Sequence, residues 1–286
     1  MKVGWVVLAV VLAGCTAAPP PETGDLAAKV ALFTAGMSPD DAYRAPTRAE
    51  RDKAVTALRP LLTGTGGADA KALASLGFGV RTGSDRGRPY VLAASEPGDE
   101  RGWGMYVADR SAPPRLVIEV PHPKADRNTE ELGVELHRRV PGSVVLIAGA
   151  HRRAAGNAAD VAHRTDSLFH AVADDLAARG VPQVQLHGFD EDNLPEYDLV
   201  LSSGAARVSG GAKRAADGAE DAGLPVCRAW RDDCGKLEGT TNAQGKAAAE
   251  HGSVFLHIEV TGRLRETVAS RDQIANVLAA AEISAP

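Results

Sequence analysis

The sequence predicts a three-layer α/β/α fold with a mixed, largely parallel central sheet, preceded by a short helical region. The first observation is a series of short apolar runs that have the length of buried strands: 115–120, 144–148, 184–186, 199–202 and 254–260. The second is that amphipathic stretches alternate with these runs, as expected for helices that cover both faces of an open sheet. The third is the turn-rich segment 83–87, which indicates a hairpin and therefore a mixed sheet.

The first residues have the layout of a bacterial export signal. Lys2 precedes an apolar run over 5–13, far shorter than the roughly 20 residues that a membrane-spanning helix needs. The segment Leu12-Ala13-Gly14-Cys15 that follows resembles a lipobox, the recognition sequence of lipoprotein signal peptidase. The resemblance implies that residues 1–14 are a signal peptide, that Cys15 carries the lipid, and that residues 15–25 are a tether. The alternative is an ordinary secretory signal with a chance cysteine.

A lipid on Cys15 would hold the protein at the cell membrane, on its extracytoplasmic face. In that oxidising compartment the other two cysteines, Cys227 and Cys234, predict a disulfide. A metal site built from this pair is the weaker alternative, because the spacing is not Cys-x-x-Cys. The formal net charge of −5, without a basic stripe, argues against a nucleic-acid partner. The sequence leaves the oligomeric state open.

Helix signals divide the rest of the chain. A helical N-terminal region, 26–76, precedes an α/β hydrolase-like catalytic domain, 77–286. Within these regions, capping-box patterns that begin at Thr47 and Ser270 predict two helix starts. Amphipathic spacing predicts one long helix over 159–179, which a glycine and a proline then end.

Histidines follow several of the predicted strands, at the edge where open α/β sheets form their sites. His122, His151 and His187 each come directly after an apolar run. Two imidazoles and one carboxylate are a common ligand set for catalytic zinc, so we expect His122, Asp126 and His187 to bind one zinc ion. Glu259 lies in an apolar strand, where an acid is either turned to solvent or held in a site. We interpret it as the base that takes a proton from water.

This order of residues resembles the zinc carboxypeptidase-like clan, which includes metallocarboxypeptidases and N-formylglutamate amidohydrolases. In that clan a histidine and an acid follow one strand, a second histidine follows a later strand, and a glutamate near the C-terminus is the base. Segment 160–169 is similar to the clan's Asp-x-Asn-Arg-x-Phe region, which implies that Arg164 holds a substrate carboxylate or polarises its carbonyl. The carboxypeptidase signature is His-x-x-Glu, whereas here the acid comes one residue later, as Asp126, or further on, as Glu130 or Glu131.

These observations predict a zinc-dependent hydrolase of an amide or peptide bond that acts outside the cytoplasm. Its candidate substrate-binding residues are His151, Arg152 and Arg164. The displaced Asp126 supports an alternative, a lipoprotein that binds a ligand on the same scaffold without activity. A third hypothesis, a metal-dependent phosphoesterase, depends on Arg152, Arg153 and Arg164 near the strand ends.

Several candidate residues also have a structural interpretation. His122, between two prolines, can be a turn residue bonded to the backbone; His187, before Gly188, can be a turn residue; and Asp126 can cap the helix that follows it. Arg164 can pair with Asp160, four residues earlier on one helix face.

Overall fold

The computed structural model describes residues 22–96 and 99–283, and its strands form one ten-stranded sheet. The predicted signal peptide, Cys15 and most of the predicted tether lie outside the described residues. In spatial order the strands are β1 (Glu22–Thr23), β2 (Phe78–Asp85), β3 (Arg88–Ser95), β4 (Met105–Asp109), β6 (Ser143–Ile147), β5 (Leu116–Val120), β7 (Gln183–Phe189), β10 (Phe255–Thr261), β8 (Leu199–Ser202) and β9 (Val226–Arg228).

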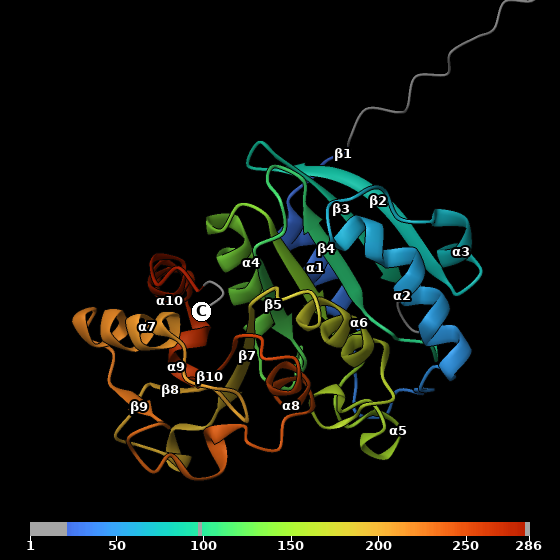
Figure 1. Ribbon diagram of the computed structural model, residues 1–286. Coiled ribbons are helices and arrows are strands. Elements are labelled where there is room, and N and C mark those ends of the chain that lie inside the picture. The colour runs from blue at the N-terminus through green and yellow to red at the C-terminus, as the bar shows by residue number, and fades with distance from the viewer. Residues whose placement is uncertain (1–21, 97–98, 284–286) are drawn as a thin grey trace, which may run out of the picture.

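The centre of the sheet is parallel and its flanks are mixed (Figure 1). Strands β6, β5, β7 and β10 run in one direction. Strands β2, β3 and β4 form an antiparallel meander on one flank, and β8 is antiparallel to β10 on the other. The predicted hairpin is the β2–β3 turn, where Arg86 and Gly87 both have the positive φ that a tight two-residue turn requires. The sheet therefore confirms the predicted fold class.

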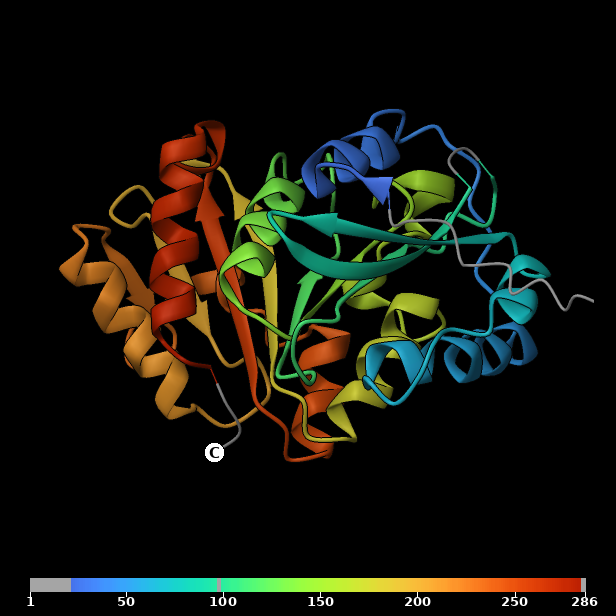
Figure 2. The same cartoon turned by 90° about the horizontal axis from the view of Figure 1, so that it is seen from above.

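Helices cover both faces of this sheet and complete three layers. One face carries α1 (Leu26–Thr34), α4 (Thr129–Arg139), α7 (Gly210–Asp221) and α10 (Val268–Ala280). The other face carries α2 (Arg48–Leu62), α3 (Ala70–Ala74), α6 (Leu168–Ala177) and α8 (Ala243–Glu250). Figure 2 shows α1 and α2 on opposite sides of β2 and β3, so the predicted helical region 26–76 contributes to both outer layers.

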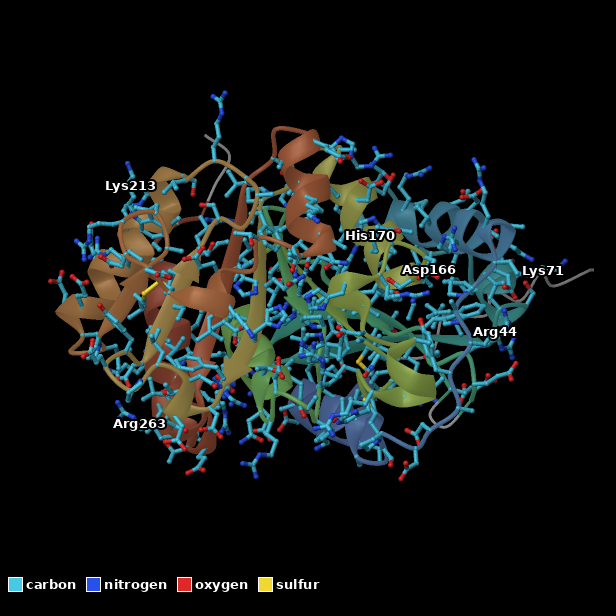
Figure 3. The ribbon with its side chains drawn as sticks, turned by 90° about the horizontal axis from the view of Figure 1, so that it is seen from below. Arg44, Lys71, Asp166, His170, Lys213 and Arg263 are labelled. Atoms are coloured by element: carbon cyan, nitrogen blue, oxygen red, sulfur yellow. A yellow bond between two sulfur atoms is a disulfide. The ribbon has the colours of Figure 1, made fainter. Side chains whose placement is uncertain are left out.

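Short helical turns connect these layers: α5 (Ala154–Asn157), η1 (Val161–His163), η2 (Glu191–Asn193), η3 (Gly235–Glu238) and α9 (Gly262–Glu266). The predicted disulfide between Cys227 and Cys234 is present and joins β9 to the start of η3 (Figure 3). Within the part of the chain that the structure describes, none of the helices has the length and apolar character needed to cross a bilayer.

The capping box predicted at Thr47 is present at the start of α2. The backbone N–H of Glu50 donates to Oγ1 of Thr47 at 3.3 Å, and the backbone N–H of Thr47 donates to Oε2 of Glu50 at 2.8 Å. The other predicted box is wrong, because α10 begins earlier, with Thr267 as its cap. Oγ1 of Thr267 accepts a hydrogen bond from the backbone N–H of Ser270 at 3.1 Å, so Ser270 lies in the first turn of the helix.

The prediction of one continuous helix over 159–179 is also wrong. Residue Arg164 is extended after the single turn of η1, and α6 begins only after Ser167. Oγ of Ser167 accepts from the backbone N–H of His170 at 3.0 Å and so caps the new helix. Asp160 does not pair with Arg164, because its carboxylate is bound to His122. The Ser167 cap and the Asp160–His122 contact are therefore found where a continuous helix would have its own hydrogen bonds and the Asp160–Arg164 pair.

Candidate metal centre

Three neighbouring parallel strands bring polar side chains to one face of the sheet. In the strand register, Glu119 of β5 lies opposite Gln185 of β7, and Gln185 lies opposite His257 of β10. One step closer to the carboxyl ends of the strands, His187 lies opposite Glu259. Because side chains alternate between the two faces of a strand, these residues form two adjacent rows on the same face.

Two histidines converge on one carboxylate oxygen at the carboxyl ends of β5 and β7. Oδ2 of Asp126 lies 3.1 Å from Nδ1 of His122 and 3.4 Å from Nδ1 of His187. The two imidazole centroids are 4.8 Å apart, and all three side chains are buried. A tight turn brings Asp126 back to His122, since the backbone N–H of Asp126 donates to the carbonyl of His122 at 2.9 Å. The structure thus brings together the three residues expected to bind zinc.

The outer nitrogen of each imidazole also has a partner. Nε2 of His122 lies 2.8 Å from Oδ1 of Asp160, and Nε2 of His187 lies 2.6 Å from Oε1 of Gln185. Metal-binding histidines usually donate their other N–H to a carboxylate, a carbonyl or water, which orients the ring and its free lone pair. The donor set therefore fits a zinc ion that is bound by the two Nδ1 atoms and by Asp126.

The electrostatics of the cluster suit a cation. Burial lowers the pKa of His187 to about 4, with Asp126 opposing the shift, so this imidazole is neutral near pH 7. Burial also lowers the pKa of His122, but Asp126 and Asp160 outweigh it and the net shift is upward. Burial raises the pKa of Asp126, yet hydrogen bonds from both histidines prevail and hold it well below its usual range. Asp126 is therefore an ionised ligand candidate in a buried position.

Glu259 lies beside this cluster, in the wall of a pocket of about 190 Å³ that His122 and His187 also line. Its side chain is 12% exposed; Oε1 is 3.9 Å from Nε2 of His257, and Oε2 has no hydrogen-bond partner. Burial, and then the charge of Asp126, raise the pKa of Glu259 well above 4.5. A carboxyl with one oxygen free of hydrogen bonds, beside candidate metal ligands, is suited to exchanging a proton with water.

Of the predicted substrate-binding residues, Arg152 lines this pocket. Its guanidinium donates to Oδ2 of Asp160 at 2.7 Å and lies 3.2 Å from Nδ1 of His122, so it has to turn away from that nitrogen for a metal ion to bind there. His151 is buried and is not among the residues that line the pocket; its Nδ1 accepts from the backbone N–H of Arg153 at 3.2 Å. The structure therefore places one of these two neighbours at the site and gives the other a turn contact.

Arg164 also lies outside the residues that line the pocket. Its guanidinium pairs with Asp166 at 2.7 Å. Asp166, labelled in Figure 3, lies towards α2, and its carbonyl accepts from Arg51 of that helix at 2.9 Å.

The two alternative acidic ligands point elsewhere. Glu130 lies 3.7 Å from Lys124, and Glu131 pairs with Arg271 on α10. Among the described residues, Asp126 is the acid that contacts both His122 and His187.

Two residues that hold the histidines were not predicted. Asp160 is separated from His122 by 38 positions, and no local pattern connects them. Gln185 did leave a signal, since polar residues at 183, 185 and 187 alternate with apolar ones and so share one face of a strand. β7 extends to Phe189, so His187 lies inside this strand and not after it.

Neither a protein-family model nor a curated protein sequence matches the chain. Among solved structures, the chain is similar to a bacteriophage poly-gamma-glutamate hydrolase, with a TM-score of 0.46 and 12% identity over 62% of this chain and 86% of that one. A tripeptide-bound cell shape determinant protein from Helicobacter pylori matches with a TM-score of 0.40 and 14% identity, over 67% of this chain and 54% of its own. An aspartoacylase family protein from Mesorhizobium loti matches with a TM-score of 0.36 and 12% identity, over 73% of this chain and 66% of its own.

Proposed function

We propose that this chain is a zinc-dependent hydrolase that cleaves an amide or peptide bond. The observation that carries the proposal is that Nδ1 of His122 and Nδ1 of His187 converge on one carboxylate oxygen of Asp126. The Nε2 atom of each histidine contacts a further side chain, which orients the ring. Such an enzyme also needs a general base, and Glu259, whose Oε2 has no hydrogen-bond partner, lines the same pocket.

A zinc ion at this position would polarise a substrate carbonyl and make water more acidic. Glu259 takes the proton of the attacking water at Oε2 and returns it to the leaving nitrogen. Arg152 places a positive charge at the pocket wall, where it stabilises negative charge that develops on the carbonyl oxygen.

The proposal is tested by amide hydrolysis, measured with a panel of peptides and N-acyl amino acids. Glu259→Gln should keep its zinc content and lose turnover by about 10²- to 10⁴-fold, the usual contribution of a general base. The control is Glu250→Gln, which changes an exposed glutamate at the end of α8 and should leave turnover unchanged. Equal turnover in the Glu259 variant, or no hydrolysis by the zinc-loaded parent chain, would overturn the proposal.

The alternative of a binding module without activity depended on a displaced acidic ligand. Asp126 lies within 3.4 Å of both histidines despite its later position in the sequence, so the spacing no longer favours that alternative.

We also propose that the protein acts outside the cytoplasm, anchored through a lipid on Cys15. The lipobox-like segment supports this location, and the Cys227–Cys234 disulfide is of a kind that persists in oxidising compartments. Cys15→Ser should move the protein from the membrane fraction to the soluble fraction and abolish incorporation of labelled fatty acid. A variant that stays in the membrane fraction would contradict the anchor.

A further inference from the structure

The amide of Gln185 is fully buried, and all of its hydrogen-bonding positions are used. Its Nε2 donates to Oε2 of Glu119 at 2.7 Å and to Oε1 of Gln244 at 3.1 Å. Its Oε1 accepts from Nδ2 of Asn242 and lies 2.6 Å from Nε2 of His187. Since a glutamine amide offers two donors and two acceptor lone pairs, no position is left over.

Two backbone groups determine the direction of the bonds in this network. Nε2 of Gln244 donates at 2.9 Å to the carbonyl of Val161, which can only accept, so Oε1 of Gln244 faces Gln185. Oδ1 of Asn242 accepts at 2.9 Å from the backbone N–H of Gly245, which can only donate, so Nδ2 of Asn242 faces Gln185. Gln185 must therefore present its Nε2 to Gln244 and its Oε1 to Asn242 and His187.

This orientation determines which nitrogen of His187 carries hydrogen. Oε1 of Gln185 can only accept, so Nε2 of His187 donates, and in a neutral imidazole Nδ1 then keeps the lone pair. Asp126 does not depend on a hydrogen from His187, because its Oδ2 already accepts from the backbone N–H of Gly188 at 3.3 Å. We propose that Gln185 is a positioning residue that keeps His187 as the Nε2–H tautomer, with Nδ1 free to bind a metal ion.

The two histidines are held by different kinds of acceptor, and burial explains the difference. Asp160, which holds His122, is 15% exposed and also pairs with Arg152, so its charge is compensated. Gln185 is fully buried, where an ionised carboxylate would be costly. An amide supplies the same acceptor oxygen without adding charge.

The inference rests on the proposed function, because it assigns a role at the same metal centre, but its test begins without metal. Ring ¹⁵N–¹H correlation spectra of the full metal-free chain should show His187 as a single Nε2–H tautomer. Gln185→Met removes the acceptor and should give a mixture of tautomers. The same variant should raise the Kd for zinc, measured by chelator competition, by about tenfold or more.

Gln183→Met is the matched control. Gln183 is a fully buried glutamine on the same face of β7, two residues earlier, and its Nε2 donates to the carbonyl of Ala173 at 2.6 Å. This variant should lose stability through the same kind of substitution, yet keep the tautomer of His187 and the zinc Kd of the parent chain.

If Gln185→Met does not fold, the double variant Gln185→Glu with Glu119→Gln replaces it. The exchange keeps an acceptor for His187 and a donor at position 119, so the Nε2–H tautomer should persist and the zinc Kd should stay within about threefold.

The inference is overturned if the parent chain holds His187 as the Nδ1–H tautomer. It is equally overturned if Gln185→Met keeps both the single tautomer and the parent's zinc Kd, or if the double variant folds and loses the tautomer. A parent chain that shows the expected tautomer but binds no zinc would instead contradict the proposed function and leave the role of Gln185 in place.

Discussion

Glu119 is a buried carboxyl group, and replacing it with glutamine should change how stability depends on pH. It is 0% exposed, its Oε2 accepts from Gln185 at 2.7 Å, and its Oε1 has no partner. Burial raises the pKa of Glu119 from 4.5 to about 8, against the smaller opposing effect of the Gln185 hydrogen bond. The folded chain therefore holds a proton at neutral pH that the unfolded chain has released.

The sign of the effect follows from this difference in bound protons. Stability falls as pH rises from 4.5 to about 8, and Glu119 adds no slope outside that interval. An interval of about 3.5 pH units, at about 1.4 kcal/mol per unit, amounts to a loss of about 5 kcal/mol. Glu119→Gln has no such proton. Its free energy of unfolding relative to the parent should therefore rise by up to about 5 kcal/mol between about pH 5 and pH 9.

Urea unfolding of both chains across this pH range, in the presence of a chelator, measures the difference. Asp109→Asn is the control, because the Asp109 side chain is 1% exposed but its pKa is lowered. Burial raises that pKa, and hydrogen bonds to Ser111 and Gly142 outweigh the burial. Asp109 is thus ionised in both states over this range, and the effect of its replacement should be the same at every pH. A Glu119→Gln difference that is equally constant would show that Glu119 does not hold an extra proton in the folded chain.

Two other variants test how the pocket is held. Segment 235–242, which contributes residues to the pocket wall, directly follows the disulfide. Replacing Cys227 and Cys234 with serine should therefore speed hydrogen exchange in this segment and raise the KM for the substrate. Unchanged exchange would contradict a supporting role for the disulfide. Gly188→Ala should lower the free energy of unfolding by about 1–3 kcal/mol, because its Cβ would lie 2.3 Å from the guanidinium carbon of buried Arg265. An unchanged urea midpoint would show that Arg265 can move aside at little cost.

The sheet could be predicted from the sequence because apolar runs report burial directly. Run 144–148 differs from β6 by one residue, and run 199–202 coincides with β8. The break in the helix predicted over 159–179 could not be predicted from the sequence pattern. The break depends in part on Asp160 binding His122, a contact across 38 positions that periodicity does not register.

The site could be predicted in outline and not in its connections. Placement near strand ends singled out His122, Asp126, His187 and Glu259. The structure gathers the first three into one cluster, and Glu259 lines the pocket that His122 and His187 also line. The hydrogen bonds that hold these side chains depend on the strand order β5–β7–β10, which places Glu119 beside Gln185 of β7. Strand order arises from packing of the whole chain, so a linear pattern does not contain it.

We propose that a zinc ion binds between His122, Asp126 and His187. Anomalous diffraction at the zinc absorption edge, from crystals grown with stoichiometric zinc, tests it most directly. We expect one strong peak about 2.0–2.2 Å from both Nδ1 atoms and from a carboxylate oxygen of Asp126. A peak bound by His257 and Glu259 instead, or no peak at these residues, would contradict it.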